Sequence, residues 1–207
     1  MIIFKYENLQ SVQNNNFYNE TPFNLILFKF LKLQNEDRLT AYIGSKQIKK
    51  RVAELAKKIR KDYKDKDPIL IGVLNGSFIF IADLVRAMGI NMEIDFLKLS
   101  SYGDSKISSG SVTLLKDLNC SIEKRHIIVI EDIIDSGLSI AYIRNLILLK
   151  HPASLEFATL LFKKETSKLD FNIKYIGFKI TNEFVVGYGL DYAQRYRNLK
   201  SIKILKK

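Results

Sequence analysis

The chain has 207 residues, of which 47% are hydrophobic and 11% aromatic. This composition is that of an ordinary globular protein with one core, and it excludes a disordered or fibrous chain. A single cysteine, Cys120, excludes an internal disulfide and a cysteine metal cluster, and it favours a reducing compartment, the cytoplasm. The net charge of +11 is compatible with nucleic-acid binding. The lysines are nevertheless scattered over predicted helix faces and the tail, so we predict a solvated surface and no nucleic-acid partner.

Residues 1–38 differ from the rest of the chain. They contain a polar run, Asn14–Asn16, and an apolar stretch, Phe23–Leu33, that has no clustered basic flank and no small-residue cleavage site. We predict a disordered leader over 1–38, either a real appendage or an overlong reading frame, and one domain over 39–207. No apolar run reaches the length of a membrane span, so no membrane partner is expected.

Apolar spacing predicts helices and strands that alternate along the remaining sequence. Helices are expected at Ser45–Tyr63, Ser77–Met88 and Gly137–Leu149, and strands at Ile69–Leu74, Asn91–Leu99, Val112–Leu115, His126–Ile130, Leu155–Leu161, Lys174–Ile180 and Phe184–Tyr188. The polar segment 100–111 is expected to be a mobile loop. Such alternation predicts an α/β fold around a mainly parallel sheet.

The most informative segment is Arg125–Ile140, which reads RHIIVIEDIIDSGLSI. His126–Ile130 is apolar without alternation, as in a strand buried on both faces of a parallel sheet. Glu131 and Asp132 follow at the carboxyl end of this predicted strand, where open α/β sheets bind ligands. Two adjacent carboxylates there repel each other and lose solvation unless something positive or hydroxylated is bound.

A loop of small residues, Asp135-Ser136-Gly137-Leu138-Ser139, then leads into the next predicted helix. Its N–H groups and the helix N-terminus suit a phosphate. Acids beside an anion cradle indicate a sugar phosphate, with the acids facing hydroxyls, a metal or a ring nitrogen. The alternative is an ordinary N-cap, in which Asp135 or Ser136 only satisfies the helix amides.

The motif VIEDIIDSG resembles the phosphoribosyl-pyrophosphate (PRPP) signature of the type I phosphoribosyltransferases. Within that group the chain is similar to the hypoxanthine (hypoxanthine-guanine) phosphoribosyltransferases. The similarity runs in family order from about residue 40 to the C-terminus, through IGVLNGSFIFIADL at 71–84, SSYG at 100–103, LLFK at 160–163 and EFVVGYGLDYAQRYR at 183–197. It implies the type I fold, a central mainly parallel sheet flanked by helices, with a small hood formed mainly by residues 181–207.

The resemblance also implies how PRPP is bound. Glu131 and Asp132 would meet the ribose hydroxyls directly or through Mg²⁺, and the loop 136–139 would cradle the 5′-phosphate. A non-proline cis peptide would lie at Leu74–Asn75, where relatives commonly carry a basic residue in place of the asparagine. The expected PRPP-binding residues are Asn75, Gly76, Ser101, Tyr102, Glu131, Asp132, Ser136, Gly137, Leu138, Ser139 and Arg197.

On the base side, the resemblance makes Asp135 the catalytic general base or acid near N7 of the purine, and Lys163 the donor to O6. Phe184 would stack on the ring, and Val185 would bind the base edge through its backbone. By sequence alone, the lysine could equally be solvated and the phenylalanine a core residue. The expected purine-binding residues are Lys163, Phe184, Val185 and Asp191, and the expected metal ligands are Glu131, Asp132 and Asp191, the last near a second Mg²⁺.

We therefore predict a Mg²⁺-dependent purine-salvage enzyme that forms homodimers or homotetramers. It would transfer the 5-phosphoribosyl group of PRPP to N9 of hypoxanthine, and of guanine, with release of pyrophosphate. Two alternatives stay open: a transferase that prefers xanthine or adenine, and a non-catalytic PRPP-sensing regulator that binds nucleic acid.

Overall fold

The computed structural model describes residues 38–101 and 112–206. The predicted leader, apart from residue 38, and the predicted mobile loop, apart from residues 100 and 101, lie outside these ranges. The helices are α2 Ser45–Tyr63, α3 Phe78–Met88 and α4 Leu138–Leu148, and the strands are β1 Arg38–Ile43, β2 Ile69–Leu74, β3 Glu93–Ser101, β4 Val112–Lys116, β5 His126–Ile134, β6 Ser154–Phe162, β7 Tyr175–Lys179, β8 Val185–Val186 and β9 Ile202–Lys206.

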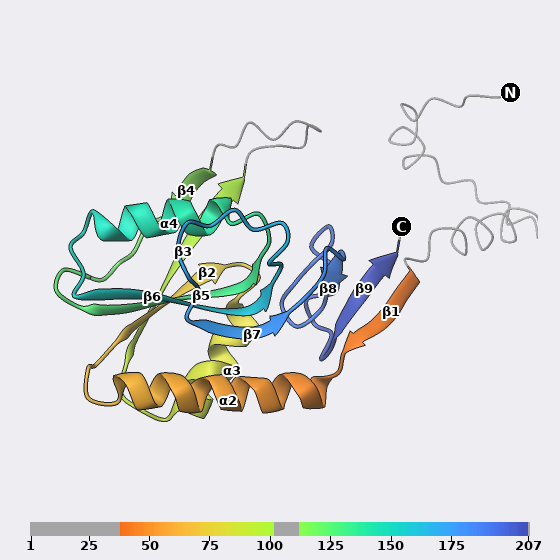
Figure 1. Ribbon diagram of the computed structural model, residues 1–207, viewed down its shortest axis with the longest axis horizontal. Helices are drawn as coiled ribbons and strands as arrows, with labels where there is room; N and C mark the ends of the chain where they lie inside the picture. Colours follow the sequence, from red (N-terminus) through yellow and green to blue (C-terminus); the bar gives the residue numbers. More distant parts are fainter. Residues whose placement is uncertain (1–37, 102–111, 207) are drawn as a thin grey trace, which may run out of the picture. The chain divides into compact units, whose positions relative to one another are not determined.

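Six strands form a sheet in the order β4-β3-β2-β5-β6-β7, in which only the edge strand β4 runs antiparallel to its neighbour. Helices α2 and α3 cover one face and α4 covers the other (Figure 1). This arrangement confirms the predicted α/β fold with a central, mainly parallel sheet. It also brings the carboxyl ends of β2, β5 and β6 to one edge, where ligands bind in such folds.

Strand β5 is buried on both faces, which explains its unbroken apolar sequence. Ile128 and Ile130 belong to the core under α2 and α3, whereas Ile127 and Val129 belong to the core under α4. All four side chains are 0% exposed. The strand is therefore held from both sides just before its carboxylates.

The predicted end of this strand at Ile130 was wrong. Pairing with β6 continues through Glu131, opposite Thr159, to Ile134, so the two carboxylates lie within the strand and not after it. A charged residue normally marks the end of a buried strand, but here the parallel neighbour supplies ladder hydrogen bonds beyond it. The predicted bounds of Ser45–Tyr63 and Ile69–Leu74 match the observed ones, and the other predicted boundaries differ by at most two residues.

A second sheet of three strands, in the order β1-β9-β8, was not predicted. It joins the first and last described strands, β1 and β9, with Arg38 opposite Lys206. The predicted strand Phe184–Tyr188 shortens to β8, because Gly187 turns the chain at a φ of +101°. This sheet corresponds to the expected hood, with β1 added to the C-terminal segment.

Candidate functional site

A cavity of about 290 Å³ opens at the carboxyl ends of β2, β5 and β6. Residues that follow β2 and β6, residues at the end of β5, and residues of the second sheet and its hairpin form its wall. We call it the site cavity, and its lining residues are Asn75, Gly76, Asp132, Ile133, Asp135, Lys163, Phe184, Val185, Leu190, Asp191 and Arg197. All but Ile133 and Leu190 were predicted site residues, Asp135 as the catalytic residue and the others as ligands of PRPP, the purine or a metal.

The turn after β2 packs directly on the carboxylate of β5. A Cβ added to Gly76 would overlap the carboxylate of Asp132, and one added to Gly189 would overlap the carbonyl oxygen of Gly76. The peptide bond Leu74–Asn75 is cis, as the family resemblance implied. Three segments distant in sequence therefore meet at Gly76 without room for a side chain.

The two carboxylates of β5 are both difficult to ionise in the free protein. Burial raises the pKa of Asp132 from 3.8 to about 6, against the lowering effect of backbone N–H groups and of Arg197. Burial and the neighbouring charge of Asp132 raise the pKa of Glu131 well above 4.5. Glu131 Oε2 is buried without a hydrogen-bond partner, although this residue is not part of the cavity wall. Both groups would be stabilised in the ionised form by a nearby cation.

Asp135 has the opposite character. Lys163 Nζ lies 2.7 Å from its Oδ2, and the Thr166 hydroxyl donates to its Oδ1 at 2.7 Å. Burial alone would raise the pKa of Asp135, but these two donors hold it below its ordinary value. The Lys163 side chain is 7% exposed and that of Asp135 51%, so the pair joins a buried cation to an accessible carboxylate at the cavity wall.

The loop after β5 forms a second, smaller cavity of about 190 Å³, lined by Ser136, Gly137, Leu138, Ala141, Thr166 and Lys168. Gly137 adopts a φ of +87° at the N-cap of α4, and no side chain caps the helix. Ser136 Oγ is a distant 3.4 Å from the Leu138 N–H, and the Asp135 side chain bonds elsewhere. The N-cap alternative is thus poorly satisfied, and the first amides of α4 can receive an anion.

Arg197 and Asp191 face each other on the hood side of the site cavity. Their side chains form an ion pair of 2.8 Å, and Arg197 also donates to the Gly189 carbonyl oxygen at 2.7 Å. Asp191 accepts the N–H of Gln194 at 2.9 Å. In the ligand-free protein both side chains therefore support the hairpin that carries them.

Phe184 lies at the cavity rim and is 45% exposed, with the Tyr192 ring 5.8 Å away at 87°. Val185 is buried beside it at the start of β8. Ser139 is in the first turn of α4 but is not part of either cavity wall. Ser101 ends β3, and Tyr102 lies outside the described residues.

Sequence reasoning missed Thr166 and Lys168. Both follow β6 on the segment that crosses over Ser136, where the Lys168 N–H donates to the Ser136 carbonyl oxygen at 3.1 Å. The sequence gives a usable signal for these two residues only once the fold is known, because Thr166 lies 31 residues after Asp135.

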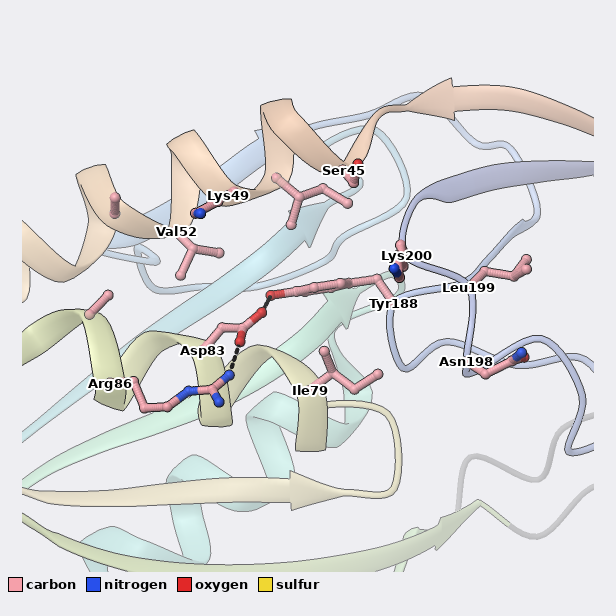
Figure 2. Close-up of a pocket in the computed structure, with 13 residues that line it drawn as sticks. Ser45, Lys49, Val52, Ile79, Asp83, Arg86, Tyr188, Asn198, Leu199 and Lys200 are labelled. Carbon is pink, nitrogen blue, oxygen red and sulfur yellow. Dashed lines mark hydrogen bonds and ion pairs between the residues drawn. The ribbon is translucent and has the colours of Figure 1, made fainter.

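A larger cavity of about 570 Å³ lies elsewhere, between α2, α3 and the segment 188–200 (Figure 2). Its wall is mostly apolar and contains none of the predicted site residues. Figure 2 shows the Tyr188 hydroxyl pointing to Asp83, to which it donates at 2.6 Å, and Arg86 paired with the same carboxylate. This cavity contains none of the carboxylates that could bind a metal or a ribose at the sheet edge.

Among residues 38–101 and 112–206, three or more histidine, cysteine or acidic side chains do not gather into a ready-made metal site. The described helices are also too short or too polar to cross a membrane. Mg²⁺ does not need such a cluster, since it is commonly held by one or two carboxylates together with substrate phosphates and water. Asp132 and the unpartnered Glu131 oxygen are suitable ligands of that kind.

Comparisons with known proteins place this site in a family. The model of the phosphoribosyl transferase domain matches residues 40–193, and the chain belongs to that family. It is 46% identical over 164 residues to the hypoxanthine-guanine phosphoribosyltransferase of Bacillus subtilis (strain 168), covering 79% of this chain and 91% of the relative.

Two solved structures extend the match to the fold. A hypoxanthine-guanine phosphoribosyltransferase from Bacillus anthracis, crystallised with HEPES in its active site, has a TM-score of 0.78 and 42% identity, covering 83% of this chain and 100% of that one. The hypoxanthine phosphoribosyl transferase of Trypanosoma cruzi, studied for the role of its C-terminal region in oligomeric state and activity, has a TM-score of 0.77 and 38% identity, covering 83% of this chain and 93% of that one. The comparisons confirm the resemblance on which the predicted enzyme class and purine-salvage role were based.

Proposed function

We propose that the protein transfers the 5-phosphoribosyl group of PRPP to N9 of hypoxanthine or guanine. The observation that carries the proposal is the pairing of Lys163 with Asp135 on the wall of a cavity that also contains Asp132. This arrangement provides a donor for a 6-oxo group, an acceptor for a ring N–H and a carboxylate for ribose hydroxyls within one pocket. The nearby turn 136–139 adds an anion site.

Base recognition follows from the ion pair. When a 6-oxopurine enters, Lys163 exchanges Asp135 Oδ2 for the purine O6, and the freed carboxylate oxygen accepts the N7–H. Adenine presents an amino donor at position 6, which would leave the buried lysine facing another donor. Phe184 stacks on the ring from the cavity rim, and the backbone of Val185 binds the remaining edge.

The PRPP half is held at the other end of the cavity. Amides of Ser136–Ser139 bind the 5′-phosphate, and Lys168 adds a positive charge at the wall of that small cavity. Asp132 accepts hydroxyl groups of the ribose, while the turn at Asn75 and Gly76 and the fork of Arg197 bind pyrophosphate. To bind pyrophosphate, Arg197 gives up part of its ion pair with Asp191 for contacts with phosphate oxygens.

Bound Mg²⁺ would be held by Asp132 and Glu131 together with PRPP oxygens, and it would neutralise pyrophosphate charge. Asp191, predicted as a further ligand, would become available when Arg197 turns to the phosphates. The buried carboxylates themselves keep the ribose oriented and disperse positive charge at C1.

In the reaction, the bond from C1 to the pyrophosphate oxygen breaks and its electron pair leaves with pyrophosphate. The N9 lone pair forms the new bond to C1 with inversion. The proton on N7, which is hydrogen-bonded to Asp135 Oδ2, passes to that oxygen. The low pKa of Asp135 in the free protein, set by Lys163 and Thr166 against burial, keeps this acceptor ionised.

Location and assembly are further parts of the proposal. One cysteine among 207 residues fits the cytoplasm. We propose a homodimer or homotetramer, and the oligomeric state of the Trypanosoma cruzi relative has been studied together with its activity. No nucleic-acid partner is proposed.

The test is direct incubation of the purified protein with PRPP, Mg²⁺ and each of hypoxanthine, guanine, xanthine and adenine, while nucleotide absorbance is followed. Nucleotide from hypoxanthine or guanine is expected, and none from adenine. Asp135→Asn should lower kcat far more than it weakens PRPP binding, and Lys163→Ala should erode the preference for 6-oxopurines. No product with any 6-oxopurine, or unchanged discrimination in the lysine variant, would contradict the assignment.

A further inference from the structure

Residues 163–168, which we call the strap, cross over the end of β5. The strap is attached to the main chain on both sides of Asp135. The Lys163 N–H donates to the Ile134 carbonyl oxygen at 2.9 Å, and the Lys168 N–H donates to the Ser136 carbonyl oxygen at 3.1 Å. These two bonds fix the register, so the middle of the strap lies over the Asp135 side chain.

Thr166 occupies that middle position. Its hydroxyl is 2.7 Å from Asp135 Oδ1, whereas the carbonyl oxygens of Asp135 and Lys163 are more distant, at 3.3 and 3.4 Å. A hydroxyl has one proton to donate, and the shortest contact identifies the carboxylate as its acceptor. Lys163 holds the other oxygen, so each carboxylate oxygen has its own donor from the strap.

The two donors differ in what happens to them on base binding. Under the proposed function, on which this inference rests, Lys163 leaves Oδ2 for the purine O6. The terminal torsion of an aspartate is broad and is not fixed by rotamer preference. Without a second restraint, the freed carboxylate would rotate away from the position at which Oδ2 faces N7.

We propose that Thr166 is a positioning residue, whose hydroxyl holds Asp135 Oδ1 while Oδ2 accepts the purine proton. The threonine also lines the small cavity beside Ser136, so it lies between the base and the 5′-phosphate without being required to touch either. Its contribution appears in the chemical step and not in the binding of substrates.

The experiment uses the full chain with Thr166→Val, which replaces the hydroxyl by a methyl group of similar size, and Thr166→Ser, which keeps the hydroxyl. Single-turnover nucleotide formation at saturating PRPP, Mg²⁺ and hypoxanthine measures the chemical step apart from product release. We expect the valine variant to lose about five- to tenfold in this rate, the effect of one hydrogen bond. KM for both substrates should stay within about twofold, and the serine variant should recover most of the rate.

The matched control is Thr40→Val, an exposed threonine of β1 in the second sheet, which should behave as the wild type does. Thermal unfolding of each variant shows that the fold is intact. Equal rates in wild type and Thr166→Val, or equal losses in the valine and serine variants, would overturn the inference while leaving the proposed function in place. An inactive wild type would overturn the proposed function, and the inference with it.

Discussion

Replacing Asp132 with asparagine should stabilise the ligand-free protein. Asp132 is 7% exposed, and burial raises the pKa of its carboxylate from 3.8 to about 6. At about 1.4 kcal/mol for each pKa unit, the folded state at pH 7.5 carries a cost of about 3 kcal/mol for ionising this group. Asparagine has no charge to desolvate, and its amide oxygen can still accept the backbone N–H groups.

The pH dependence of this stabilisation tests whether burial of the Asp132 charge is its cause. Because the folded pKa lies above the unfolded one, the folded protein binds more protons between about pH 4 and pH 6, and its stability falls as the pH rises through that window. The advantage of Asp132→Asn should therefore be greatest at pH 7.5 and small at pH 4.5. Loss of the Asp132 charge also relieves its repulsion of Glu131, which acts in the same direction.

Urea unfolding of the wild type and of Asp132→Asn, in EDTA at pH 4.5, 6 and 7.5, measures the difference in their free energies of unfolding directly. Asp170→Asn, at an exposed position, is the matched control and should change the free energy of unfolding by less than about 0.5 kcal/mol. At pH 7.5, added Mg²⁺ and PRPP should stabilise the wild type but much less the Asp132 variant. A gain that is independent of pH, or no gain at pH 7.5, would refute the argument from burial.

Three further changes follow from contacts described here. Gly76→Ala places a Cβ on the neighbouring carboxylate of β5 and should lower kcat/KM at least a hundredfold in initial-rate assays, whereas Gly44→Ala, which meets only a flexible glutamine side chain, should not. Asp95 accepts backbone N–H groups that lower its pKa to about 2 against burial. Its contribution is present above pH 4 and is lost as the pH falls toward 2. The free energy of unfolding of Asp95→Asn, measured by urea titration, should therefore lie below that of the wild type by about 2 kcal/mol at pH 7 and approach it at pH 2.5. Tyr188→Phe removes the 2.6 Å bond to Asp83 and should cost about 1 kcal/mol, visible as a melting temperature lower by about 2–4 °C; an unchanged value would mean that the bond contributes nothing net.

Features set by local sequence were predictable. The turn at Asp135–Ser139 needs small residues and a glycine at positive φ, and these can be recognised without knowing the fold. The same is true of α2, whose apolar spacing gave the observed boundaries, Ser45–Tyr63. The edge of the sheet at which the site lies also followed, because parallel strands bring their carboxyl ends together.

Features that depend on distant partners were not predictable. β1 and β9 are short segments whose strand character depends on pairing with distant parts of the chain, β1 with β9 and β9 also with β8. The extension of β5 depends on β6. The hydrogen bond from Thr166 to Asp135 depends on the strap, in which Thr166 lies 31 residues further along the chain. The roles of individual site residues stay predictions, since ligand binding by each awaits the experiments above.

The second sheet has a consequence for the order in which the molecule assembles. It pairs Arg38 with Lys206, near opposite ends of the described chain, so it requires closure of the longest loop in the domain. The six-stranded sheet joins strands much nearer in sequence and can form first. β1 would then add to β9 late in folding, and the second sheet, to which Val185 belongs, would open early in native-state hydrogen exchange. The wall proposed to receive the purine would then be the least rigid part of the site cavity, while the wall proposed to hold the sugar would already be fixed by the six-stranded sheet.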